Sequence, residues 1–307
     1  MPFDDPSKPG LDADQVIDGR RKIGFGANSE HAVLFDLCGV RPQEQVMSVP
    51  VFRFAPSPNG RLHLGHAYSA LLNEKMARQA TGRLLLRIED TDQTRCRPEF
   101  TAGIFEDLAW LGITWEEPVR VQSEHLTEYQ ANLERLWSMN VLYPCFCSRK
   151  LAFATGLSAR DPDGLPLYSG TCRQIPKHEA KARIFARAIY GWRLDMKACM
   201  DMDAAIWGDV VIAKPHVGSS YHIAVVTDDA VQAVTHVVRG TDIEAATPIH
   251  KLLQRLLGFP TPQYHHHRLL LDDERRKLSK SLGSKSIAAL REEGITAQDI
   301  RRQLGFE

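Results

Sequence analysis

The chain has 307 residues, of which 43% are apolar, so it is long enough to bury one large or two ordinary hydrophobic cores. Lysine plus arginine and aspartate plus glutamate both number 38, which excludes a generally basic protein. The sequence has neither a run of about 18 apolar residues nor the pattern of a secretory signal. We therefore predict a cytoplasmic protein without a membrane partner.

The first 46 residues contain proline, glycine and aspartate without a sustained hydrophobic period. They precede the first apolar strand pattern, and Met47 stands just before that strand. We predict that residues 1–46 are a flexible extension or the product of an upstream start, and that a chain beginning at Met47 keeps its activity.

The segment that follows alternates between strand and helix patterns. Strands are predicted over 51–55 and 84–89, where short apolar runs are continuous. Helices are predicted over 65–80, 98–112 and 126–137, the last because its apolar residues recur at helical spacing. This order is typical of an α/β fold whose parallel sheet is covered on both faces.

After residue 144 the pattern breaks into a cysteine-bearing stretch that is rich in proline and glycine. Strands are predicted again over 210–213, 222–226 and 235–239, followed by a helix over 249–257. Two short helices are predicted near the end of the sequence, over 287–293 and 297–304. The pattern indicates one α/β domain with an insertion between its halves.

Residues 63–66 read His-Leu-Gly-His and lie after a strand and a turn, at a predicted helix start. A helix N-terminus offers N–H groups and partial positive charge to phosphate, and glycine lets a ligand approach the backbone. Two imidazoles at this spacing reach the same polyphosphate. Two histidines that only cap the helix would give the same pattern, so the motif alone is suggestive.

Residues 277–281 read Lys-Leu-Ser-Lys-Ser. Two lysines flanked by hydroxyl groups in a loop can neutralise the charge that develops as a pyrophosphate leaves. A solvated charge run is the alternative for this segment alone. The presence of both motifs in one chain favours nucleotide chemistry.

With these two motifs the chain resembles the class I aminoacyl-tRNA synthetases, which pair a His-x-Gly-His near the first strand with a Lys-Met-Ser-Lys-Ser loop after a Rossmann-type fold. Leu278 replaces the methionine and keeps an apolar anchor. The glutamyl subgroup is indicated by five stretches that span nearly all of residues 51–290. They read RFAPSPNGRLHLGH, LLLRIEDTD, YHIAVVTDD, THVVRGTDI and LLLDDERRKLSKS.

The resemblance also implies how the chain is divided. Residues 47–144 and 201–265 are expected to form the two halves of a Rossmann-type catalytic domain. Residues 145–200 are expected to form a zinc-bearing, acceptor-like insertion between them. Residues 266–307 carry the Lys-Leu-Ser-Lys-Ser loop and the C-terminal helices.

Glutamate has two carboxylates and one ammonium group, so a selective site needs two cations and an anion. Arg53, Arg239 and Glu89 meet this need and stand at predicted strand ends, where open α/β sheets bind their ligands. An ordinary surface ion pair is the alternative for each of them. The family pattern adds four residues after Arg53 and one tyrosine to the glutamate site: Phe54, Ala55, Pro56, Ser57 and Tyr221.

The implied reaction begins when the α-carboxylate of glutamate attacks the α-phosphorus of ATP, giving glutamyl-adenylate and pyrophosphate. The resemblance assigns this step to His63, His66 and Lys280, which contact the phosphates and the departing pyrophosphate. Mg²⁺ is expected to accompany ATP. The remaining residues of the expected ATP site are Gly65, Lys277 and Ser279.

Cys145 and Cys147 are followed by Cys172 in a short, loop-rich segment. Three thiolates bind a tetrahedral Zn²⁺ when a fourth ligand is supplied, and buried inert thiols are the alternative. The glutamyl-queuosine tRNA(Asp) synthetases, short relatives of the glutamyl enzymes, have a zinc site of the form Cys-x-Cys followed by Tyr-x-x-x-Cys. This resemblance implies Tyr168 as the fourth ligand of one structural zinc ion.

Residues 265–267 are three consecutive histidines, which suggest a second metal site. Adjacent side chains on a strand point in opposite directions, however. We therefore predict that these histidines do not share one ion.

Only 26 residues follow Ser281, whereas discriminating glutamyl-tRNA synthetases continue with a helical anticodon-binding region. The shortening resembles the queuosine-modifying family, which joins glutamate to queuosine in the anticodon loop of tRNA(Asp) and activates glutamate without tRNA. Residues 149–193 contain 9 lysines and arginines against 3 acidic residues, which is compatible with an RNA partner. We therefore expect a monomeric ligase whose partners are L-glutamate, ATP and queuosine-bearing tRNA(Asp).

Three other functions remain open. The chain could be a truncated glutamyl-tRNA synthetase that charges the acceptor end of tRNA(Glu), or a catalytically silent tRNA-binding paralogue. The intact histidine and lysine motifs argue against the silent paralogue. A small nucleotidyltransferase would share His-x-Gly-His but predicts neither the two arginines nor the lysine loop.

Overall fold

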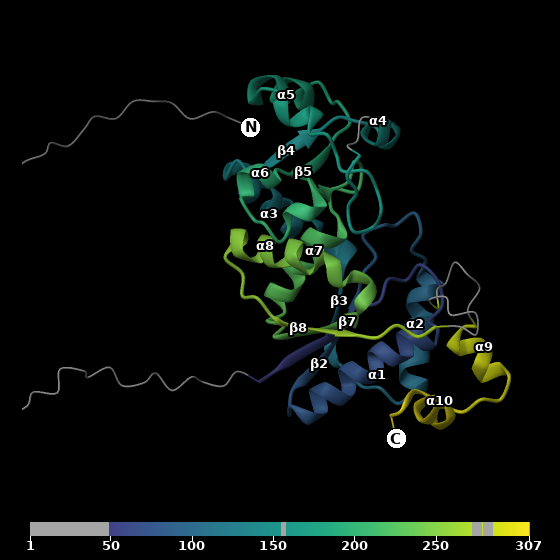
Figure 1. Ribbon diagram of the computed structural model, residues 1–307. Coiled ribbons are helices and arrows are strands. Elements are labelled where there is room, and N and C mark those ends of the chain that lie inside the picture. The colour runs from purple at the N-terminus through teal and green to yellow at the C-terminus, as the bar shows by residue number, and fades with distance from the viewer. Residues whose placement is uncertain (1–48, 155–157, 272–277, 279–284, 307) are drawn as a thin grey trace, which may run out of the picture. The chain divides into compact units, whose positions relative to one another are not determined.

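The computed structural model describes residues 49–154, 158–271, 278 and 285–306. A five-stranded sheet in this part of the chain has the order β3-β2-β1-β7-β8, and its strand pairs are parallel (Figure 1). The predicted α/β fold is confirmed. The strands are β1 (Val51–Phe54), β2 (Arg83–Ile88), β3 (Glu116–Val121), β7 (His236–Gly240) and β8 (Gln263–His267).

The strand order creates a switch point at β1. Its neighbour on one side is β2, which follows it in the chain, and its neighbour on the other side is β7, far along the sequence. Phe52 pairs with His236 across this second junction. A parallel sheet leaves a crevice at the carboxyl ends of the strands on either side of a switch point, so the segments that follow β1, β2 and β7 are brought together.

Successive side chains of the strands face different helices, because the side-chain period of a strand is two. Phe54, Leu86 and Ile88 share one hydrophobic core with the first two helices, α1 and α2. Figure 1 shows α1 and α2 on one side of the sheet and α7 and α8 on the other. The long helices are α1 (Leu64–Gln79), α2 (Pro98–Trp110), α3 (Leu126–Ser138), α7 (Tyr221–Val231) and α8 (Thr247–Leu257).

The two short C-terminal helices are α9 (Ile287–Glu292) and α10 (Ala297–Leu304), as predicted. Ser286 and Thr296 cap them, since each side chain accepts a hydrogen bond from the backbone of the first turn. Ile287, Ile300 and Leu304 enter the core that α1 and α2 form on their side of the sheet.

A separate three-stranded antiparallel sheet, β4-β5-β6, contains the cysteine-bearing segment. It begins at Leu142 and ends at Ala213, so it extends past the expected insertion 145–200 at both ends. Its strands are β4 (Leu142–Cys145), β5 (Gly191–Leu194) and β6 (Val211–Ala213). The short helices are α4 (Arg149–Ala154), η2 (Thr171–Gln174), α5 (Lys177–Phe185), α6 (Met196–Cys199) and η3 (Ala205–Trp207).

The strand predicted over 222–226 is wrong, because this segment lies inside helix α7. Its residues are buried on every side, with Ile223, Ala224, Val225 and Val226 all nearly inaccessible to solvent. A continuous apolar run of this length does not distinguish a central strand from a fully enclosed helix. The strand predictions for 210–213 and 235–239 correspond to β6 and β7.

Some predictions concern residues outside the part of the chain that the structure describes. These are the extension 1–46 and the three ATP-site residues Lys277, Ser279 and Lys280. Among the helices described, none is both long and apolar enough to cross a membrane.

Candidate active site

A cavity of about 1030 Å³ lies at the carboxyl ends of β1, β2 and β7. The N-terminus of α1 forms another part of its wall. The structure thus brings segments from both halves of the sequence to one site. The sequence-predicted residues that line the cavity are Arg53, Phe54, Ala55, Pro56, Ser57, His63, Gly65, His66, Glu89, Tyr221 and Arg239.

His63 and His66 hold each other at the start of α1. Nδ1 of His63 accepts from the Gly65 N–H at 3.1 Å, and Nδ1 of His66 accepts from the His63 N–H at 3.2 Å. Capping of the helix therefore occurs, and it does not compete with a role in phosphate binding. Since each Nδ1 is an acceptor, the proton of each neutral ring lies on Nε2, the form that can donate to a phosphate oxygen.

Gly65 is required by the same arrangement. A Cβ atom at this position would lie 2.9 Å from Cε1 and 3.1 Å from Nδ1 of His63. Any side chain would therefore displace the ring that caps the helix.

A buried charge network made of Arg53, Arg87, Glu89 and Asp229 lies beneath the amino-acid end of the cavity. Asp229 Oδ1 accepts from Arg53 Nε at 3.3 Å and from Arg87 Nη1 at 2.8 Å. Arg87 Nη2 donates to Glu89 Oε1 at 3.3 Å. Arg87 has no solvent exposure, and the network joins β1 and β2 to α7.

The network sets the protonation of its members. Burial alone would raise the pKa of Asp229, but Arg53 and Arg87 together hold it below the usual value. Burial is the dominant effect on Glu89 and raises its pKa, although both arginines oppose it. Glu89 lines the cavity, so a bound ammonium group would restore the charge that burial disfavours.

Arg239 differs from Arg53 in its partners. It donates to Thr247 Oγ1 at 2.7 Å and to His250 Nδ1 at 2.9 Å, and to Tyr221 Oη and His266 Nε2 at 3.4 Å each. Each of these acceptors is neutral, and within the described residues no carboxylate lies at ion-pair distance from this guanidinium. Among the described residues, this buried cation therefore has no carboxylate partner.

A second group of charges fixes α7 against β3. Asp228 accepts from Arg120 at 2.7 Å, from Gln122 at 2.8 Å and from the Tyr129 hydroxyl at 3.0 Å. Asp228 is fully buried, so these bonds satisfy a carboxylate that would otherwise be costly to enclose. They orient α7 so that the adjacent Asp229 faces β1 and β2.

The lysine loop is represented in the described part of the chain by Leu278. Its N–H donates to the Leu270 carbonyl at 3.1 Å, and both leucines line the cavity. This position agrees with the apolar anchor expected from the sequence.

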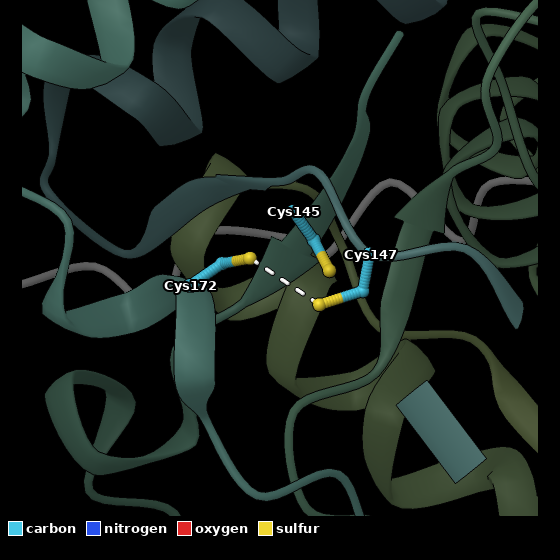
Figure 2. Close-up of side chains that lie close together, drawn as sticks. All are labelled: Cys145, Cys147 and Cys172. Atoms are coloured by element: carbon cyan, nitrogen blue, oxygen red, sulfur yellow. Dashed lines mark hydrogen bonds between the residues drawn. The ribbon is translucent and has the colours of Figure 1, made fainter. Parts of the chain in front are cut away.

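A candidate metal centre lies in the antiparallel sheet region. Figure 2 shows the side chains of Cys145, Cys147 and Cys172 directed toward one another, and their sulfur atoms all lie within 4.8 Å. Tyr168 Oη is 3.5 Å from Cys145 Sγ and 3.3 Å from Cys147 Sγ. The structure therefore brings together all four residues that the sequence suggested, and the cluster could hold a metal ion.

The spacing of these atoms fits a tetrahedral ion. Zinc–sulfur bonds of about 2.3 Å place neighbouring sulfur atoms roughly 3.8 Å apart, and the Cys147 and Cys172 sulfur atoms are 3.5 Å apart. Hydrogen bonding from Cys172, supported by Tyr168 and Arg193, lowers the pKa of Cys145 to about 4. A thiolate is the form that binds metal, so the site has at least one ligand that readily ionises.

The consecutive histidines of β8 point in different directions. His266 Nε2 lies 3.0 Å from Thr247 Oγ1, on the side of Arg239, whereas the His267 ring packs edge-on against Tyr68 of α1. The two rings lie on opposite faces of the sheet, as expected for adjacent residues of a strand.

Sequence reasoning missed Arg87, Asp228, Asp229 and His250. Arg87 and the two aspartates are inside stretches that carried the resemblance, but the bonds that join α7 to β2 and α3 connect residues more than 90 positions apart in the sequence. The sequence did contain a signal for the two aspartates. They come at the end of an apolar run, and charged groups at the end of a buried element need partners.

A parallel sheet whose switch point faces a histidine pair at a helix N-terminus defines a nucleotide-binding protein of the Rossmann type. Residues 49–305 match the model of the tRNA synthetases class I (E and Q), catalytic domain. The chain belongs to this family.

Two relatives and one solved structure illustrate the range of the match. The chain is 42% identical over 281 residues to a glutamyl-Q tRNA(Asp) synthetase of Rhodobacter capsulatus, covering 83% of this chain and 100% of the relative. It is 35% identical over 275 residues to glutamate--tRNA ligase 2 of Nitrosococcus oceani, covering 81% of this chain and 57% of the relative. A crystal structure of glutamate-tRNA synthetase from Elizabethkingia anophelis superposes with a TM-score of 0.71 at 26% identity. The match covers 83% of this chain and 61% of that structure.

Proposed function

We propose that this protein is a ligase that activates L-glutamate with ATP and transfers it to queuosine in the anticodon loop of tRNA(Asp), with activation independent of tRNA. The observation that carries this proposal is the match to the whole length of a glutamyl-Q tRNA(Asp) synthetase at 42% identity. The chain spans just over half of the glutamate--tRNA ligase to which it is 35% identical.

The charges around the cavity support glutamate as the amino acid. Arg53 and Arg239 bring two guanidinium groups to the cavity, and Arg239 has no carboxylate partner among the described residues. A substrate with two carboxylates, such as glutamate, complements this pair better than glutamine, whose side chain ends in a neutral amide. In this proposal Glu89 receives the ammonium group, and Arg53 and Arg239 receive the carboxylates.

ATP is proposed to lie at the other end of the cavity, with its phosphates at His63, Gly65 and His66 and with Mg²⁺ accompanying it. Lys277, Ser279 and Lys280 are proposed to complete this site and to stabilise the departing pyrophosphate. The chemistry requires positioning of the glutamate α-carboxylate against the α-phosphorus and no covalent enzyme intermediate.

We also propose that Cys145, Cys147, Tyr168 and Cys172 hold one structural Zn²⁺. The ion would link β4 to the η2 segment and supply no chemistry to the reaction. Because its acceptor is a tRNA, the protein is proposed to act in the cytoplasm. It is also proposed to be a monomer.

The test measures the two steps separately. Glutamate-dependent ATP–pyrophosphate exchange without tRNA tests activation, and Lys280→Ala should reduce it by at least about 100-fold. Transfer is then followed with radiolabelled glutamate and three acceptors: tRNA(Asp) carrying queuosine, tRNA(Asp) lacking it, and tRNA(Glu).

Label in queuosine-bearing tRNA(Asp) alone is the expected result. Preferential labelling of tRNA(Glu) would replace the proposal with a glutamyl-tRNA synthetase activity. If no adenylate forms with any acceptor, the protein is a silent tRNA-binding paralogue. An unchanged exchange rate in Lys280→Ala would remove Lys280 from the mechanism.

A further inference from the structure

Arg239 is held in place by an unusual set of partners for a buried cation. Its side chain is almost completely enclosed, with 5% exposure, and it lines the cavity at the end of β7. A carboxylate partner would fix the guanidinium but would also neutralise it. The imidazole of His250 fixes it at 2.9 Å without doing so.

The hydrogen bonds define the proton positions on two histidines. An arginine can only donate, so Nδ1 of His250 must be an unprotonated acceptor and the ring proton must lie on Nε2. That Nε2 lies 3.1 Å from Nδ1 of His222, which must then accept in turn and carry its own proton on Nε2. Arg239 and the two neutral rings form a directed chain in which hydrogen bonds are donated from β7 to α8 and from α8 to α7.

Both imidazoles are kept neutral by their surroundings. His250 has no solvent exposure, and burial, with nearby positive charge, holds its pKa well below the usual value. Burial is also the main cause that lowers the pKa of His222 to about 4, with Arg239 and Lys214 adding to it. A protonated ring at either position would face the Arg239 guanidinium and would lose the lone pair that accepts the hydrogen bond.

We propose that His250 is a positioning residue for substrate recognition: its neutral imidazole orients Arg239 toward the cavity and leaves the full charge of the guanidinium for a carboxylate of the amino-acid substrate. His250 does not line the cavity, so it acts through Arg239 and does not touch the substrate. The inference rests on the proposed function in taking that substrate to be glutamate.

The test replaces His250 with asparagine or glutamine, whose amide groups differ only in their distance from the backbone. In His250→Asn the side-chain oxygen can occupy the place of Nδ1 and accept from Arg239, whereas in His250→Gln the amide extends toward the place of Nε2 and the acceptor for Arg239 is lost. We expect His250→Gln to raise KM for glutamate in pyrophosphate exchange by about 10- to 100-fold, and His250→Asn to stay within about threefold of the parent protein. KM for ATP should be unchanged in both.

His236→Leu is the matched control. His236 lies on β7 as well but faces the opposite side of the sheet, where its ring stacks on Phe52 at 4.5 Å. Its loss should leave KM for glutamate unchanged. Ring ¹⁵N NMR of the parent protein supplies a readout independent of activity, in which His250 and His222 should both show an unprotonated Nδ1 and a protonated Nε2.

The outcomes separate the two levels of inference. Equal KM values for glutamate in His250→Gln and His250→Asn, or a protonated Nδ1 on His250 in the parent protein, would overturn the positioning role. Absence of glutamate-dependent exchange in the parent protein would overturn the proposed function instead, and the NMR signals would still decide the orientation of the histidine chain.

Discussion

Asp229 is the residue that connects the two cations of β1 and β2. It is 3% exposed and accepts from both Arg53 and Arg87, and Arg87 in turn contacts Glu89. Removing one member of a buried charge group leaves the others without compensation, which costs more than the loss of a surface pair. The geometry of the amino-acid end of the cavity therefore depends on a side chain that does not line it.

We predict that Asp229→Asn raises KM for glutamate by about 10- to 100-fold, because Arg53 and Arg87 lose their common charged acceptor and Arg87 also holds Glu89. KM for ATP should change little. Pyrophosphate exchange at varied glutamate concentration measures the effect. Glu74→Gln is the control, since Glu74 is a buried carboxylate of α1 that pairs with Arg301 outside the cavity, and it should lower stability only. Equal KM values in the two variants would contradict the prediction.

Asp107 of α2 presents a different problem at the same scale. It is fully buried, and neither carboxylate oxygen has a hydrogen-bond partner in the described part of the chain. Burial raises the pKa of Asp107 to about 6, against the opposing charges of Arg61 and Arg291. A raised carboxyl pKa means that the folded state favours the proton, so this contribution to stability is full at low pH and is lost as the pH rises through about 6.

We predict that Asp107→Asn is more stable relative to the parent protein at pH 8 than at pH 5, by about 1.4 kcal/mol in the free energy of unfolding. Urea unfolding at the two pH values measures this difference. Glu106→Gln, an exposed neighbour on α2, should show no such change. A parent-to-variant difference that is the same at both pH values would disprove the assignment.

At the scale of elements, α1 and α7 shape the cavity in opposite ways. The N-terminus of α1 presents its first turn and the histidine pair to the cavity. Helix α7 contributes Tyr221 to the wall, while Asp228 and Asp229 on its later turn hold it to the sheet. One helix thus presents its histidine pair to the cavity, and the other supplies the charge that holds Arg53 and Arg87.

We predict that Gly65→Ala reduces the rate of pyrophosphate exchange at low ATP by about tenfold, because the added Cβ displaces the His63 ring and obstructs phosphate at the helix N-terminus. KM for glutamate should be less affected than KM for ATP. Gln79→Ala, at the exposed end of the same helix, controls for a change in helix propensity. An unchanged KM for ATP would remove Gly65 from the nucleotide site.

At the scale of the molecule, the cysteine cluster joins two parts of the insertion that lack a large hydrophobic core of their own. The small cluster around it contains Tyr143, Ala152 and Tyr168 together with the cysteines. Small modules of this kind are commonly stabilised by a metal. Tyr168 is further fixed by the guanidinium of Arg193 on β5, which lies 3.9 Å from the centre of its ring.

We predict that the purified protein contains one equivalent of zinc, and that chelation lowers the melting temperature by roughly 10 °C. Hydrogen exchange should increase in residues 142–194 before it increases in β1, β2 and β7. Cys147→Ser should lose the metal, whereas Cys199→Ser, outside the cluster, should retain it. Metal-free protein with unchanged hydrogen exchange would show that the thiols are inert.

The sequence by itself determined the class of fold, the two nucleotide motifs, the charged residues Arg53, Glu89 and Arg239 that line the cavity, and the three cysteines of the cluster, to which the family resemblance added Tyr168. These features are readable because each is a local pattern: a strand followed by a turn and a helix start, or ligands at short spacing. Only the tertiary structure decided that residues 222–226 are helical, because an enclosed apolar run has the same composition in a helix and in a central strand. It also decided that Asp229 and His250 hold the arginines, because these contacts join residues that meet only when α7 and α8 close over the sheet.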